Sequence, residues 1–318
     1  MRKQLVSFAI LIGLLCAVPP IAYWLDDLFL LSLASRCLIL ASAAVATNLI
    51  MGYGGLISLG HAVFIGIGGY VVGIASHHAF NDGMTWLSNG FLQLVAVLVL
   101  SVMVALFVGL VSLRTKGIYF LMITLAIGQM FYLAAVGAYD YGGDDGMTVF
   151  AKSRFLGQAL SGHYLIYWVS AAYLTASMFL VARLSSSRFG LVLRSAKVNE
   201  ARTRAMGYEP FRVRLVAFTV AGVIAGGAGF LMANHAGFVS PAMLHWTRSG
   251  DLIVMVVLGG LGSVFGPLAG TVAFLALEEV LSGITEYWAI PVGAILIAVA
   301  LYTPQGVMGL LSRRRNHG

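Results

Sequence analysis

The sequence predicts an all-α polytopic membrane protein with about ten transmembrane helices, some of them short or broken by glycine. Of its 318 residues, 60% are apolar and only 10% are charged, and the mean hydropathy is +0.93. A soluble domain carries roughly 25% charged residues. Apolar runs of about 20 residues, the length that crosses a bilayer, follow one another along the chain. The 38 glycines are typical of membrane bundles, because small residues let helices approach closely.

Six apolar runs have the required length without a strong interruption. The first of them follows the charged start Met1-Arg2-Lys3, as a signal peptide would, but no small-residue cleavage site comes after it. We therefore expect this run to be retained as a helix. The six predicted spans are residues 5–24, 28–50, 91–113, 117–138, 164–184 and 213–234.

Four further spans are less regular. Residues 56–76 are long enough to cross the membrane but contain several glycines. Residues 252–265 and 266–281 are short and meet at a Gly/Pro-rich break, which could instead form a re-entrant loop. Residues 288–303 form a last short span. The chain is therefore predicted to be one membrane domain over residues 1–318, with a long loop at residues 139–163 and another at residues 185–212.

The distribution of Lys and Arg agrees with ten spans and sets the orientation, because basic residues accumulate on cytoplasmic loops. With both termini in the cytoplasm, all 19 basic residues except Arg36, Lys152, Arg154 and Arg248 lie on cytoplasmic segments. Arg36 falls inside a span, where an ionisable residue suggests a function, although it could also snorkel or bond a carbonyl. The net charge of +7 follows from this topology and does not indicate nucleic-acid binding.

The cytoplasmic loop at residues 185–212 contains a good helix-forming sequence, residues 195–206, followed by Gly207 as a stop signal. Val198, Ala201 and Ala205 are spaced to share one face of that helix, and basic residues cover the remaining surface. Such a helix could offer a small apolar face to a partner protein. It could equally rest on anionic lipid, and the residues alone do not separate the two interpretations.

Two glycine-rich segments in separate halves of the chain point to a central translocation path. In the first, Asn48, Ser58 and His61 could offer hydrogen bonds to a polar solute, because non-helical backbone at membrane depth needs protein or water around it. The alternative is that Phe64 and the nearby glycines only pack helices together and that a neighbour satisfies His61. The second segment supplies Gly259, Gly260, Gly262 and Ser263.

The chain lacks the motifs of an enzyme. It has no G-x-x-x-x-G-K-[ST] phosphate loop, so ATP hydrolysis would have to come from separate proteins. The spans offer no nucleophile–base set and no metal-ligand set. We therefore predict no catalytic residue, no cofactor and no bound metal. The lack of a series of buried carboxylates also argues against a secondary carrier driven by protons or sodium.

Several ordered motifs resemble those of the LivM-type permeases of branched-chain amino-acid ABC importers. The resemblance runs from about residue 41 to residue 309. Its motifs are Asn48-x3-Gly52-Tyr-x-Gly55-x2-Ser58-Leu-Gly-His61-x2-Phe64, Arg114-Thr-Lys-Gly117-Ile-Tyr-Phe120 with Thr124-Leu125, Gly142-Gly-Asp-Asp-Gly146, Gly259-Gly-Leu-Gly-Ser263-x2-Gly266 and Pro304-x-Gly306.

This resemblance implies a permease subunit in the bacterial plasma (inner) membrane that translocates branched-chain or other small neutral amino acids. Its partners would be a homologous second permease, two ATP-binding subunits, an extracytoplasmic solute-binding protein and membrane lipid. Related permeases carry urea or short amides, so these solutes remain an alternative; an autonomous secondary carrier is another. The helix that contacts the ATPase would correspond to Lys197, Asn199, Glu200, Ala201, Arg204, Ala205 and Gly207.

Overall fold

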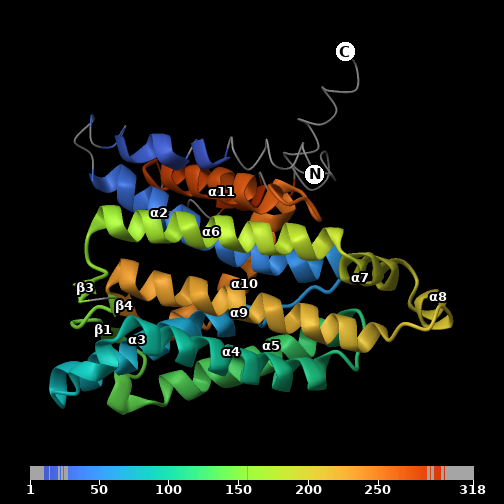
Figure 1. Cartoon of the computed structure of the whole chain (residues 1–318), viewed down its shortest axis with the longest axis horizontal. Helices are drawn as coiled ribbons and strands as arrows, with labels where there is room; N and C mark the ends of the chain where they lie inside the picture. Colours follow the sequence, from blue (N-terminus) through green and yellow to red (C-terminus); the bar gives the residue numbers. More distant parts are fainter. Residues whose placement is uncertain are drawn as a thin grey trace.

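The computed structural model describes residues 28–155 and 157–284, together with positions 11–13, 15–20, 22, 24, 287, 290–294 and 297. In this part of the chain, long helices form one bundle and the short strands gather at one end (Figure 1). The predicted spans at residues 5–24 and 288–303 lie in part outside the described residues. The count of ten spans therefore stays a prediction.

Among the described residues, six helices are long and apolar enough to cross a membrane. Each corresponds to a predicted span, but the one predicted at residues 56–76 begins later, because residues 54–61 are not helical. The six are α2 with its π-helical end η1 (Leu28–Asn48 and Leu49–Tyr53), α3 (Ala62–Asn81), α4 (Gly90–Ser112), α5 (Ile118–Val136), α6 (His163–Ser186) and α9 (Pro210–Ala236).

Helix α9 is central, packing against α2, α3 and α4 (Figure 1). Glycine permits its close approach to α3. A Cβ atom on Gly68 would come within 1.9 Å of the Gly226 carbonyl oxygen, and one on Gly229 would come within 2.0 Å of the Ile65 carbonyl oxygen. The two backbones therefore touch, which is the arrangement that small residues allow in membrane bundles.

Helices α10 (Trp246–Gly259) and α11 (Gly266–Ser282) form a hairpin that packs against α2. The predicted span at residues 252–265 is wrong in its bounds: α10 begins at Trp246 and stops at Gly259. It stops there because Gly260 and Gly262 adopt φ values of +110° and +74°, which only glycine reaches without strain.

The two ends of the bundle differ (Figure 1). At one end, which we call the α8 end, α7 (Arg188–Val198) and α8 (Glu200–Ala205) follow α6. At the other, the strand end, β1 (Met147–Thr148) pairs with β4 (Phe238–Val239), and β2 (Arg154–Phe155) pairs with β3 (Gln158–Ala159). Single turns of 3₁₀ helix complete the described elements: η2 (Thr85–Ser88), η3 (Tyr139–Tyr141) and η4 (Pro241–Met243).

Candidate functional site

The predicted helix over residues 195–206 is in fact two helices. Helix α7 ends at Val198 and α8 begins at Glu200, and between them the backbone of Asn199 is extended, with φ −153° and ψ 104°. The Asn199 side chain accepts a hydrogen bond from the Arg202 N–H at 2.9 Å, which is the contact that favours Asn at a helix N-terminus. Gly207, with φ +84°, follows α8 as the predicted stop.

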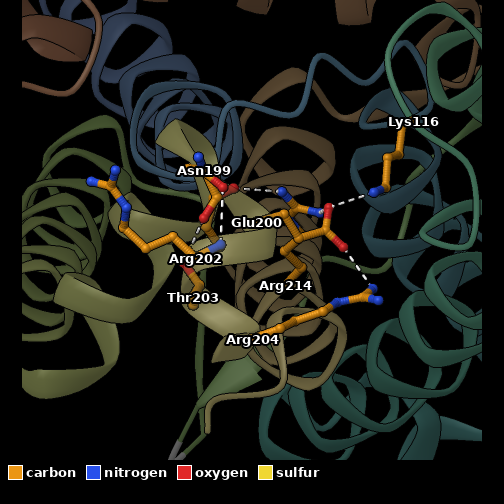
Figure 2. Close-up of polar contacts among 8 residues, drawn as sticks. Lys116, Asn199, Glu200, Arg202, Thr203, Arg204 and Arg214 are labelled. Atoms are coloured by element: carbon orange, nitrogen blue, oxygen red, sulfur yellow. Dashed lines mark hydrogen bonds and ion pairs between the residues drawn. The ribbon is translucent and has the colours of Figure 1, made fainter. Parts of the chain in front are cut away.

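Glu200 is the centre of an ion-pair cluster that fastens α8 to the bundle (Figure 2). One carboxylate oxygen accepts from Arg204 at 2.7 Å. The other lies 2.8 Å from the Lys116 ammonium and 3.1 Å from the Arg214 guanidinium. Lys116 belongs to the loop between α4 and α5, and Arg214 lies in the first turns of α9. One carboxylate therefore joins α8 to the ends of three spanning helices.

The environment of Glu200 favours its charged form. Burial of the carboxyl would raise its pKa, but the hydrogen bonds and positive charges of Lys116 and Arg214 outweigh that effect and hold the pKa below its usual range. Arg214 also donates to the Ala196 carbonyl oxygen at 3.0 Å. The same guanidinium thus holds the last turn of α7 and the first turn of α8.

The surface of α8 that points away from this cluster is uncovered. Ala201 and Ala205 are exposed, as is Val198 at the end of α7, with 85% of its surface accessible. Only Thr203 of α8 is buried. Among the described residues, α8 therefore presents small apolar side chains together with the predicted basic ones.

Lys197 connects α7 with η1, the π-helical end of α2, and with the non-helical segment that follows it. Its ammonium donates to the Gly52 carbonyl oxygen at 2.9 Å. Its aliphatic stem lies so close to Gly55 that a Cβ atom there would come within 2.6 Å of the Lys197 Cγ. Gly55 also has φ +69°. A side chain at position 55 would meet both the lysine and an unfavourable backbone conformation.

Asn48 brings the two glycine-rich segments together. Its side-chain amide donates to the Ser263 carbonyl oxygen at 2.8 Å, and its Oδ1 accepts from the Gly262 N–H at 2.9 Å. The residue is buried. Because both ends of the amide are occupied by the α10–α11 turn, Asn48 clamps the end of α2 to that turn and has little hydrogen-bonding capacity left for a solute.

His61, Ser58 and Phe64 are also buried, but they lie apart from this clamp. The His61 ring makes edge contacts with the Phe64 and Phe218 rings, at centroid distances of 5.7 and 5.6 Å. Within the described residues neither ring nitrogen of His61 has a hydrogen-bond partner. The Ser58 hydroxyl accepts from the Gly60 N–H at 3.3 Å. The His61 and Phe64 rings thus pack against Phe218 of α9.

The glycines of the second segment serve close packing and turning. A Cβ atom on Gly259 would lie 1.8 Å from the Gly266 carbonyl oxygen, so the two helices of the hairpin touch there. The Ser263 hydroxyl donates to the Gly260 carbonyl oxygen at 3.0 Å and closes the turn. The Gly262 N–H donates to the Asn48 side chain, as described above. The second segment therefore meets the first through its own backbone atoms.

Sequence reasoning missed two contacts. The Ala62 N–H at the start of α3 donates to the Ser249 hydroxyl at 2.8 Å, which ties α3 to α10. Arg36 forms an ion pair of 3.0 Å with Glu278, so α2 and α11 are joined by opposite charges. The second contact had a signal in the sequence, since Arg36 and the adjacent pair Glu278-Glu279 are the charges of two otherwise apolar runs.

Comparison with known proteins gives one family and several relatives. The family described as branched-chain amino acid transport system / permease component matches residues 29–300. The high-affinity branched-chain amino acid transport system permease protein LivM of Salmonella typhimurium is 25% identical over 300 residues, which cover 87% of this chain and 69% of that protein.

Two further relatives come from other organisms. The high-affinity permease protein LivH of Escherichia coli K12 is 28% identical over 196 residues, covering 58% of this chain and 62% of LivH. A probable branched-chain amino acid transport permease protein LivM of Methanocaldococcus jannaschii is 22% identical over 317 residues, covering 83% of this chain and 89% of that protein. No solved structure matches the chain.

Proposed function

Because this chain belongs to the family of branched-chain amino acid transport permease components, we propose that it is the permease subunit of an ATP-driven importer. The solute is a branched-chain or another small neutral amino acid. Support for that solute comes from the LivM and LivH relatives, which are permease proteins of branched-chain amino acid transport systems. The chain itself moves the solute without chemical change, and partner subunits hydrolyse the ATP.

The observation that carries this proposal is the way α8 is attached. It is a short helix whose outer surface is uncovered and whose inner side is fixed to the bundle through Glu200. A helix that merely rested on lipid would not need a rigid connection to the ends of α4, α5 and α9. The attachment instead suits a helix that a soluble partner displaces and that transmits this displacement to the bundle.

Several contacts could transmit that displacement from α7 and α8 to the spanning helices. Displacement of α8 acts on α9 through Arg214 and on the α4–α5 loop through Lys116. Displacement of α7 acts on the glycine-rich end of α2 through the Lys197 contact to Gly52. The Asn48 clamp carries the motion on to the turn between α10 and α11. Alternating access then follows from a change in how these segments meet.

We expect the predicted partners to bind at the two ends of the bundle. Two ATP-binding subunits face the α8 ends of this chain and of a homologous second permease. A solute-binding protein delivers the amino acid at the strand end. The α8 end is cytoplasmic and the protein is a multi-pass component of the bacterial plasma membrane, with the path lined near Asn48, Ser58, His61, Phe64, Gly259, Gly260, Gly262 and Ser263.

Uptake by the reconstituted complex tests the proposal. Ala201→Arg and Ala205→Arg place a large charged side chain on the exposed surface of α8 without touching the Glu200 cluster. We expect each to lower ATP-dependent leucine uptake at least 10-fold and to abolish the stimulation of ATP hydrolysis by the loaded binding protein. Ser186→Arg, an exposed position just before α7, is the matched control and should leave both activities near the wild-type level.

Unchanged uptake and stimulation in both alanine variants would show that α8 does not contact the ATPase. Uptake into reconstituted vesicles also distinguishes the two rival functions. Gradient-driven uptake by this chain without any ATPase would identify an autonomous carrier. Competition by urea or acetamide, with no competition by leucine or valine, would identify an amide permease.

A further inference from the structure

An apolar cavity opens between α4, α6 and α9, towards the strand end. Its volume is about 470 Å³, within the range of roughly 300–1,000 Å³ found for small-molecule sites. Helix α4 contributes Leu94 and Leu98, α6 contributes Val169 and Tyr173, and α9 contributes Leu231. The Tyr173 hydroxyl is already used, because it donates to the Ile224 carbonyl oxygen at 2.7 Å. The wall is therefore almost entirely apolar.

The cavity belongs to the membrane-facing side of the bundle. All three helices are long enough to cross the membrane, and the lining residue Leu98 and its neighbour Val99 are 37% and 51% exposed. Tyr164 and Trp168 are 40% and 45% exposed in the first turns of α6. Tyr and Trp side chains are enriched at the level of the lipid headgroups. The aromatic residues thus place this end of the cavity beside the membrane surface.

The hairpin of β2 and β3 lies at this mouth, and two basic residues, Lys152 and Arg154, lie just before β2 and at its start. Phe155 and Gln158, which face each other across the hairpin, both line the cavity. Ser153 fixes the approach to the hairpin: its N–H donates to the Asn234 side chain of α9 at 3.0 Å, and its hydroxyl donates to the Gln93 side chain of α4 at 2.5 Å.

Lys152 and Arg154 flank Ser153, so their backbone lies next to the contacts that Ser153 makes with α4 and α9. Lys152 is half-buried and Arg154 is exposed, and no ion pair joins either to another described residue. They are two of the few basic residues outside the predicted cytoplasmic segments. In the orientation proposed above, positive charge at this end runs against the usual bias, and an anion would neutralise it.

We propose that this cavity binds one acyl chain of an anionic phospholipid from the leaflet at the strand end, and that Lys152 and Arg154 hold its phosphate. An apolar chamber open to the bilayer takes a hydrocarbon chain, and a basic rim at headgroup depth takes the charge. The lipid fills the space between α4 and α6 and supports α9 from the side. This site is separate from the α8 attachment and from the Asn48 clamp.

Native mass spectrometry of the purified full-length chain tests the site. Phosphatidylglycerol and phosphatidylcholine with identical acyl chains are added at equal concentration, and the bound lipid is counted. We expect phosphatidylglycerol to be retained at least 10-fold more than phosphatidylcholine. The double variant Lys152→Ala, Arg154→Ala should lower phosphatidylglycerol retention to the phosphatidylcholine level, whereas Arg188→Ala, an exposed cation at the α8 end, should not.

Substitutions that fill the cavity give a second, independent test of the lipid site. Leu98→Trp places an indole inside the cavity, whereas Val99→Trp, one position along α4 and outside the lining, points the same group elsewhere. We expect Leu98→Trp to reduce retention at least 10-fold and Val99→Trp to leave it unchanged. Val169→Phe, from the α6 side, should repeat the first result if Leu98→Trp does not fold.

Three results would overturn the proposal. Equal retention of the two lipids would remove the role of the cations. Full retention by both filled variants would place the lipid elsewhere. A disulfide formed by an added oxidant between Leu98→Cys and a cysteine introduced into the second permease, with loss of the lipid on assembly, would make the cavity a subunit interface.

Discussion

At the residue scale, Asn48 and Glu200 stand out because each joins segments that are far apart in the sequence. Asn48 is buried and satisfies a partly buried N–H and a partly buried carbonyl of the α10–α11 turn. Glu200 meets Lys116 and Arg214 from two different spans. Each side chain satisfies backbone groups or charges at the ends of other helices, so its removal should cost more than the loss of a surface contact.

Asn48→Ala should destabilise the chain. It leaves the Gly262 N–H and the Ser263 carbonyl without their partner, and an unsatisfied buried polar group costs about 1–3 kcal/mol. Thermal unfolding of the purified protein in detergent measures the effect. Asn81→Ala is the control, since the Asn81 side chain lies exposed and contacts only His77. Equal melting temperatures for the two variants would contradict the clamp.

Glu200→Gln should lower the free energy of unfolding by about 1.5–3 kcal/mol at neutral pH, the usual worth of hydrogen bonds to a charged group. The pKa of Glu200 is lower in the folded state, so its contribution is complete above the unfolded pKa and is lost as the pH falls through the folded pKa. The melting curves of wild type and variant should therefore converge in acid.

Glu209→Gln is the matched control for that titration. Glu209 pairs with Arg212 only at the surface, with 63% of its side chain exposed, and exposed pairs contribute little. Its melting temperature should follow that of the wild type at every pH. A Glu200→Gln difference that persists unchanged in acid would mean that the carboxylate charge is not what stabilises the fold.

At the scale of single elements, the glycines of the α10–α11 hairpin are the sharpest feature. A Cβ atom on Gly270 would lie 1.8 Å from the Met255 carbonyl oxygen, whereas one on Gly250 would meet nothing within 4 Å. Both glycines are helical, and they belong to the two helices of one hairpin. Comparing alanine at the two positions therefore distinguishes the effect of glycine on helix packing from its effect on helix propensity.

Gly270→Ala should push α11 away from α10 and cost about 1–3 kcal/mol, the usual penalty for an overpacked contact. Gly250→Ala should be neutral or stabilise by up to about 1 kcal/mol, because alanine favours a helix more than glycine does. Thermal unfolding of the two variants side by side checks this. A smaller loss for Gly270→Ala than for Gly250→Ala would rule out the close approach.

The sequence predicted these elements unevenly, and the reasons are physical. Long apolar runs such as α4 and α9 were located well, because length and hydropathy are local properties. The break at Asn199 was missed, since most of residues 195–206 are good helix formers and the division depends on the capping contact of Asn199. The contacts of Asn48 and of Arg36 with Glu278 could not be paired from one sequence, because they join residues more than 200 positions apart.

At the scale of the whole molecule, the predicted charge bias and the structure agree on which loops share an end. Lys116 meets Glu200, so the α4–α5 loop and the residue 185–212 loop lie together. The acidic loop with Gly142, Gly143 and Gly146, all at positive φ, lies at the opposite end with β1 and β4. Which end faces the cytoplasm is a separate question: the charge bias predicts that it is the α8 end, and labelling can test this.

Single cysteines at the two ends make that test. The chain has two cysteines, Cys16 and Cys37, both free, and serine at each gives a background without thiols. Val198→Cys and Tyr139→Cys then place one thiol at each end, at positions that are 85% and 84% exposed. In intact cells, a membrane-impermeant maleimide should label the cysteine at position 139 and leave position 198 unlabelled until the membrane is opened. The reverse labelling pattern would show that the protein has the opposite orientation in the membrane. In that orientation α8 could not contact a cytoplasmic ATPase, so the same measurement also tests the proposed source of the driving force.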